Sequence, residues 1–244
     1  MFPASIAWGV GAGCAVFLAW ALARELDPDH DVSAFVAAGL MLAGLLFFDL
    51  PTLLTLFWVL LLPRIVDRTV GLPARFLDSL AVLGLGSWLT WQGGWIYGLI
   101  MALAFLLDGL LPNPRRLHLP FAAGAVIVAG IGLVVRRDFS GEDALPLPAM
   151  LAILASSVLF LLVIVGSRRV ESVGDATSDT LQPRRVQAAQ VLALPTAILA
   201  AWWDGGAGLT ALLPVWEAML GATLYRLVLL SHQFLTWTTV NAQR

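Results

Sequence analysis

Residues 144–167 read ALPLPAMLAILASSVLFLLVIVGS, a stretch without a charged side chain that ends directly before Arg168 and Arg169. A helix needs about 20 apolar residues to cross the hydrocarbon of a bilayer, at about 1.5 Å of rise per residue. This stretch therefore predicts a membrane-spanning helix. The two arginines mark the point at which the helix is expected to meet water.

The rest of the chain has the same character. Hydrophobic residues make up 59% of the 244 residues and charged residues only 12%, about half of the share that is usual in soluble domains. These charges are too few to cover a water-soluble surface. We expect an all-α fold, with residues 1–244 forming a single transmembrane domain, a polytopic helix bundle of about nine spans and at least about seven. The expected spans are 4–23, 33–48, 51–66, 74–91, 95–111, 120–135, 147–166, 187–203 and 208–231.

Two apolar blocks are too long for one crossing and are expected to be helical hairpins. Residues 32–63 would run about 48 Å as one helix, whereas the hydrocarbon core is about 30 Å thick. Pro51 favours a helix start at that point and disfavours helix in the residue before it. In residues 74–111, the sequence WQGGW at 91–95 has the composition of a turn. Each block is therefore expected to cross twice.

The distribution of arginine gives the expected orientation, because connections on the cytoplasmic side of a membrane are enriched in basic residues. The first, third, fifth and seventh connections hold ten arginines, whereas the even-numbered connections hold two, Arg136 and Arg137. The ten are Arg24, Arg64, Arg68, Arg75, Arg115, Arg116, Arg168, Arg169, Arg184 and Arg185. We expect the N-terminus outside, the C-terminus inside, and the protein in a prokaryotic cytoplasmic (inner) membrane.

Charge and cysteine content exclude several classes of protein. The net charge of −2 lacks the basic footprint of a nucleic-acid binder, so membrane lipid is the expected partner and nucleic acid is not. The single cysteine, Cys14, excludes an intramolecular disulfide and a cysteine metal cluster. The longest polar segment, residues 167–187, is expected to be a flexible cytoplasmic loop.

The densest polar stretch reads RELDPDHD at residues 24–31. Asp27, Asp29 and Asp31 alternate along it, and their carboxylate oxygens could hold Mg²⁺. A simpler interpretation is a turn between two helices, in which Pro28 ends the first helix and the acids favour the start of the second. The sequence leaves both interpretations open.

Further candidates follow the third and fifth spans and open the fourth. The candidates for catalysis are Asp67, Asp78 and Asp108, and those for phosphate binding are Arg64, Arg68, Arg115 and Arg116. Carboxylates and arginines at a membrane boundary suit a diphosphate or a lipid-linked phosphate, whose charge a metal and guanidinium groups would share. Helix capping and extension of arginine side chains to lipid headgroups would place the same residues there.

The leading functional hypothesis is a membrane-embedded enzyme that acts on a lipid- or isoprenoid-linked phosphate at the cytoplasmic face. One alternative is a small-molecule or ion-coupled transporter that uses Glu217, since an ionisable residue inside a span is a functional candidate. Another is a non-catalytic subunit, and Gly9 and Gly13 have the spacing that permits close packing on a partner helix or a second copy. The sequence shows no Ser-His-Asp set, phosphate loop or zinc signature.

Overall fold

The computed structural model describes residues 2–69, 73–135, 145–175 and 179–242. In these residues it contains nine α-helices, and the only extended pairing is a single bridge between Val173 and Thr180. The helices are α1 (Phe2–Leu26), α2 (Asp31–Gly44), α3 (Leu53–Asp67), α4 (Phe76–Gly93), α5 (Ile96–Leu110), α6 (His118–Val135), α7 (Leu147–Gly166), α8 (Pro183–Ala211) and α9 (Leu213–Ala242). The expected all-α fold is confirmed, and each expected span corresponds to one helix.

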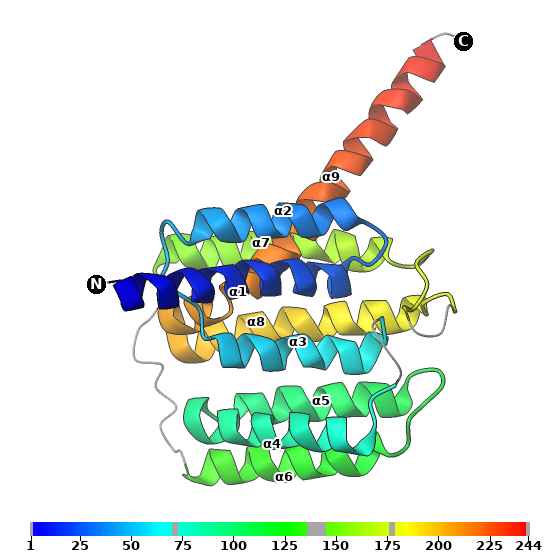
Figure 1. Ribbon diagram of the computed structural model, residues 1–244. Coiled ribbons are helices and arrows are strands. Elements are labelled where there is room, and N and C mark those ends of the chain that lie inside the picture. The colour runs from blue at the N-terminus through cyan, green and yellow to red at the C-terminus, as the bar shows by residue number, and fades with distance from the viewer. Residues whose placement is uncertain (1, 70–72, 136–144, 176–178, 243–244) are drawn as a thin grey trace.

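The helices lie side by side with roughly parallel axes, and only the last part of α9 leaves the bundle (Figure 1). α3 and α8 occupy the middle, where α3 packs on α1, α5 and α8. On one side α5 packs on α4 and α6, and on the other α9 packs on α1, α2 and α7. Large apolar side chains fill the space between them, and Trp58, Phe105 and Phe160 are completely buried.

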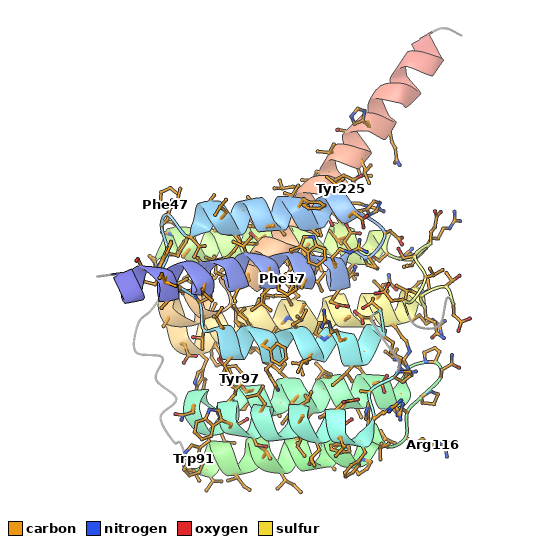
Figure 2. The ribbon with its side chains drawn as sticks, viewed as in Figure 1. Phe17, Phe47, Trp91, Tyr97, Arg116 and Tyr225 are labelled. Carbon is orange, nitrogen blue, oxygen red and sulfur yellow. The ribbon has the colours of Figure 1, made fainter. Side chains whose placement is uncertain are left out.

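The four connections that follow α1, α3, α5 and α7 gather at one end of the bundle, which we call the arginine-rich end (Figure 1). Hydrogen bonds join them: the amide of Ser172 donates to Asp29 Oδ1, and the amide of Asp175 donates to the carbonyl of Thr69. Figure 2 places Arg116 at this end and Trp91 and Phe47 at the other. The alternation on which the orientation argument depends is therefore present, whereas Arg136 and Arg137 lie outside the described residues.

Both expected hairpins are present. The chain leaves helical geometry between α2 and α3, around Asp49 and Pro51, and turns between α4 and α5 at Gly94. Gly94 has φ +115°, a conformation that residues with a Cβ rarely adopt, and an added Cβ would lie 2.7 Å from the indole nitrogen of Trp203. The turn in the 91–95 sequence thus depends on this glycine.

Five helices are long and apolar enough to cross a membrane: Ser5–Leu26 within α1, α6, α7, α8, and Leu213–Gln233 within α9. α2 and α5 are apolar but shorter. Only 11% of the most apolar window of α7 is buried inside the protein, so its leucines and valines face outward around most of its surface. A surface of this kind is stable in lipid and would aggregate in water, which makes the chain an integral membrane protein.

The expected flexible loop at 167–187 contains ordered structure on both sides of residues 176–178. The amide of Leu181 donates to the carbonyl of Ser172, and that of Gly174 donates to the carbonyl of Asp179. Val170, Leu181 and Val186 form a small buried cluster beneath this hairpin. Residues from Pro183 onward belong to α8, so the segment is largely folded onto the bundle.

Candidate functional site

The arginine-rich end contains every candidate residue from the connections that follow α1, α3 and α5, but in separate groups. One group surrounds Asp108, a second surrounds Glu25 and Asp67, and a third occupies the connection between α1 and α2. The first two are buried, and their polar atoms bind mainly one another. An open groove at the same end holds arginines of a different kind, which have no such partners.

Asp108 is the centre of the first group. Its Oδ1 accepts hydrogen bonds from Arg68 Nη2 at 2.7 Å and from Arg185 Nη1 at 2.6 Å. Arg185 also donates to the carbonyls of Val66 and Pro112, so one guanidinium joins the ends of α3, α5 and α8. The Asp108 side chain is completely buried and that of Arg185 is 3% exposed. Arg68 and Asp108 are thus brought together as the sequence suggested, but as a closed ion pair.

The other carboxylate oxygen of Asp108 leads to an arrangement that the sequence analysis missed. Asp108 Oδ2 lies 2.6 Å from His118 Nδ1, and His118 Nε2 lies 2.9 Å from Ser79 Oγ. The statement that the chain lacks a Ser-His-Asp set was therefore wrong, since these are the contacts of a catalytic triad in the usual order. All three residues are completely buried, and Ser79 also donates to the carbonyl of Arg75. No hydroxyl is presented to a substrate, so the chain of contacts joins α4, α5 and α6.

The second group contains two buried carboxylates and one arginine. Glu25 Oε1 accepts from Arg64 Nε at 2.6 Å, and Glu25 Oε2 accepts from the hydroxyl of Thr69. Asp67 Oδ1 accepts from the amide of Thr69 at 3.2 Å. Both acids are 1% exposed, and Asp67 Oδ2 has no hydrogen-bond partner among the described residues. Arg64 is consequently occupied by Glu25, which the sequence had suggested only as a further oxygen ligand for a cation beside Asp27, Asp29 and Asp31.

The acidic connection between α1 and α2 places its three aspartates on different partners. Asp27 Oδ1 lies 2.8 Å from His30 Nδ1, and Asp31 pairs with Arg24. The hydrogen bond to Asp27 raises the pKa of His30 above its ordinary value of 6.5, against an opposing effect of burial. Asp29 accepts from the amides of Glu171 and Ser172, which ties this connection to the hairpin after α7.

Among the described residues, no three side chains of His, Cys, Asp or Glu lie close enough together to hold a metal ion. The Asp27, Asp29 and Asp31 carboxylates would each have to leave a protein partner in order to share one. Magnesium at this connection stays a prediction.

The remaining candidates open α4 or follow α5. Asp78 Oδ2 accepts from the amide of Arg75 at 2.8 Å, so it caps the start of α4. Arg115 donates to the carbonyl of Pro73 at 3.0 Å. Arg116 is exposed, and its guanidinium makes no hydrogen bond or ion pair with a residue that the structure describes. Of the four arginines proposed for phosphate, three thus have protein partners.

An open groove of about 910 Å³ lies at the arginine-rich end between the end of α7 and α9. We call it the α7–α9 groove. Its lining consists of Asp29, His30, Val165, Gly166, Arg168, Arg169, Glu171, Ser172, Arg226 and Gln233. The sequence analysis used Arg168 and Arg169 only to assign orientation and did not connect Arg226 with them. Helical spacing could not reveal this, because Arg226 comes from a span 57 positions after Arg169.

The absence of a side chain at Gly166 makes room for the guanidinium of Arg226 at the groove. A Cβ added at Gly166 would lie 2.2 Å from Arg226 Nη2, so the guanidinium lies directly against the backbone of α7. Arg226 is only half-exposed, yet it makes no hydrogen bond or ion pair with the described residues, and neither do Arg168 and Arg169. Three guanidinium groups with unused donors therefore border one groove, a set of donors suited to phosphate oxygens.

Glu217, the candidate for transport, lies one turn inside the start of α9. Its Oε1 is 3.5 Å from the position of a Cβ built on Gly44, the last residue of α2, so the carboxyl is near the end of the bundle opposite the arginine-rich end. The expected span of 208–231 placed Glu217 well inside the last helix, whereas α9 starts only at Leu213, so Glu217 lies nearer to the start of the helix. It is 8% exposed and bonds to no described residue.

Comparison with known proteins adds no assignment to this geometry. No protein family model matches the chain, and neither a curated protein nor a solved structure matches it.

Proposed function

We propose that this protein binds the phosphate-bearing headgroup of a membrane lipid, including a lipid- or isoprenoid-linked phosphate, in the α7–α9 groove. The observation that carries the proposal is the meeting of Arg168, Arg169 and Arg226 at one groove, where their guanidinium groups bond to none of the described residues. A hydrogen bond from a charged donor contributes about 1.5 to 3 kcal/mol, and a phosphate can accept several.

The position of the groove supports a lipid over a soluble phosphate. Val165 lines the groove and is exposed, and with Val158, Leu161 and Leu162 it forms an outward-facing apolar strip along α7. A lipid whose headgroup entered the groove could place its acyl or isoprenoid chain along this strip. A soluble phosphate would leave the strip without a role in binding.

In this proposal the arginine-rich end faces the cytoplasm and all nine helices cross or enter the membrane, with the N-terminus outside. Labelling of single cysteines introduced at Arg116 and at Trp91, from each side of sealed vesicles, tests the orientation. We expect the first to react only from the cytoplasmic side and the second only from the outside. Reaction of both from one side would contradict the proposed topology.

The acids that the sequence proposed for catalysis do not line the groove, since Asp67, Asp78 and Asp108 bind other groups. The groove therefore supports recognition of a lipid phosphate as the first step of any reaction. A reaction at that phosphate and a role for magnesium in it are further proposals, which are to be tested after binding has been measured.

Binding is tested with the full chain in phosphatidylcholine nanodiscs that contain a minor fraction of an anionic phospholipid. We expect Arg226→Gln to weaken retention of the anionic lipid about tenfold, the loss that corresponds to about 1.4 kcal/mol. Arg116→Gln is the matched control, because Arg116 is exposed at the same end but lies outside the groove. Equal losses in the two variants would point to general surface charge and overturn the proposal.

A second candidate function, coupled transport, is favoured by Glu217, which is a nearly buried carboxyl without a partner among the described residues. Glu217→Gln should then abolish proton-coupled flux in liposomes while the protein stays folded. Unchanged flux in this variant would remove Glu217 from consideration.

A further inference from the structure

Granting the proposed lipid-phosphate function, we infer that the α7–α9 groove selects a lipid with a terminal phosphate, that is, a phosphomonoester or diphosphate, over a lipid with a phosphodiester headgroup. The two classes differ at the phosphorus. A diester has two non-bridging oxygens and one negative charge, whereas a terminal phosphate has three such oxygens and about 1.5 to 2 negative charges near neutral pH.

The donors of the groove come from three separate parts of the chain. Arg168 and Arg169 follow α7, Arg226 belongs to α9, and His30 lies in the connection between α1 and α2. Donors on different sides of a ligand can be satisfied together only by acceptors that point in different directions. Three terminal oxygens meet this condition, and the two oxygens of a diester, with an alcohol group in the third position, do not.

His30 is held in place for such a role. Its Nδ1 lies 2.8 Å from Asp27 Oδ1, and its ring lies 5.0 Å from the ring of Tyr225 on α9. This fixes the ring between two elements and leaves Nε2 as the nitrogen that bonds to no described residue. In the protonated imidazole, Nε2 donates a hydrogen bond, and Asp27 favours that form.

The acidic residues of the groove reduce its positive charge less than a formal count suggests. Asp29 directs its carboxylate to the amides of Glu171 and Ser172, three hydrogen bonds of 2.9 to 3.3 Å that offset its charge. Glu171 is exposed, as Arg168 and Arg169 are, so water screens these three side chains alike and the half-exposed Arg226 is screened least. The three guanidinium groups are thus left facing whatever anion enters.

The inference is tested by competition in nanodiscs of the full chain. Phosphatidic acid supplies a terminal phosphate and phosphatidylglycerol a diester on the same diacylglycerol. We expect phosphatidic acid to be retained about tenfold more tightly, or about 1.4 kcal/mol. His30→Gln should reduce this ratio to about unity, with the loss falling mainly on phosphatidic acid.

The outcomes separate this inference from the function on which it rests. Equal binding of the two lipids, with both lost in Arg226→Gln, would overturn the selectivity and leave the lipid-phosphate function intact. If Arg226→Gln weakened the binding of neither lipid, both the selectivity and the lipid-phosphate function would be overturned. Glycerol phosphate in solution distinguishes the source of the phosphate: displacement of phosphatidic acid at similar concentrations would show that the lipid chain adds nothing and would contradict the lipid class.

Discussion

Arg185 and Asp108 are 77 positions apart in the chain, and Arg185 Nη1 lies 2.6 Å from Asp108 Oδ1. Both side chains are almost completely buried. Arg68 shares the same carboxylate oxygen. One carboxylate therefore contacts two guanidinium groups, and this group joins the ends of α3, α5 and α8. The stability contributed by such a buried ionic group depends strongly on the presence of all three side chains.

Replacement of Asp108 by asparagine is expected to be severely destabilising. Arg185 would remain buried and Arg68 partly buried without the carboxylate that both contact, and removal of one partner of a buried ion pair costs about 3 to 5 kcal/mol. The measurement is the thermal unfolding midpoint in detergent. Asp78→Asn is the control, because it removes an exposed helix cap worth about 1 kcal/mol. Similar midpoints for the two variants would show that the Asp108 group is not a structural centre.

Asp67→Asn is expected to behave in the opposite way. Asp67 is buried beside Glu25 and one of its oxygens has no partner among the described residues, so its charge gains little from its surroundings. The amide keeps the acceptor for Thr69 and removes a buried charge. We expect an unchanged or higher unfolding midpoint. A loss as large as that of Asp108→Asn would indicate a partner for the free oxygen.

Gly94→Ala is expected to destabilise the turn between α4 and α5. The φ of +115° and the contact with Trp203 both oppose a side chain, and a residue held in such a conformation costs about 1 to 3 kcal/mol. Gly130→Ala provides the comparison, since its added Cβ would meet nothing within 4 Å in the interior of α6. That change should raise stability by about 0.5 to 1 kcal/mol. The midpoints should therefore move in opposite directions.

The pairing of Asp27 and His30 predicts a dependence of stability on pH. The folded protein raises the pKa of His30 above 6.5, mainly through the hydrogen bond to Asp27, so it binds this proton more tightly than the unfolded chain does. The contribution is complete below pH 6.5 and is lost as the pH rises through the folded pKa. Unfolding midpoints between about pH 5 and 8 should show this loss in the parent protein and not in His30→Gln. Parallel curves would refute it.

Gly166→Ala tests the groove without changing its charge. The new methyl group would collide with the guanidinium of Arg226, which has to move away from α7. We expect weaker retention of anionic lipid at an unchanged unfolding midpoint. Gly124→Ala is the matched variant, since its Cβ would make an ordinary contact of 3.9 Å with Leu83. Undiminished lipid binding in Gly166→Ala would show that the position of Arg226 is irrelevant.

Hydropathy was sufficient to locate the helices, because each helix corresponds to a largely charge-free run in the sequence. It located the two hairpin turns for the same reason, and Gly94 confirms one of them. The ends were less predictable: the start of α9 lies at Leu213 and α8 continues through Gly205 with a non-helical φ of 58°, where a simple loop was expected. Composition alone does not distinguish a bent helix from a loop.

The side-chain partners could not be predicted in the same way. Arg68 and Asp108 were both candidates, but the sequence contains no signal that joins them to Arg185, which had been read only as a marker of orientation. His118 was overlooked because a lone polar residue at the end of an apolar run is usually in water, and Glu25 was considered only with the neighbouring aspartates, not as a partner of Arg64. In the folded bundle, neighbouring connections bury the side chains of Glu25 and His118, and this burial cannot be read from the local sequence.

The hydrogen bonds from Glu171 and Ser172 to Asp29 also bear on the order in which the protein can be completed. A ribosome has made more than half of the chain before the amides that Asp29 requires have been synthesised. α2 also packs on α9, which is synthesised later still. The hairpin of α1 and α2 therefore leaves the ribosome before these partners exist, and its contacts with them form only after α9 has been made.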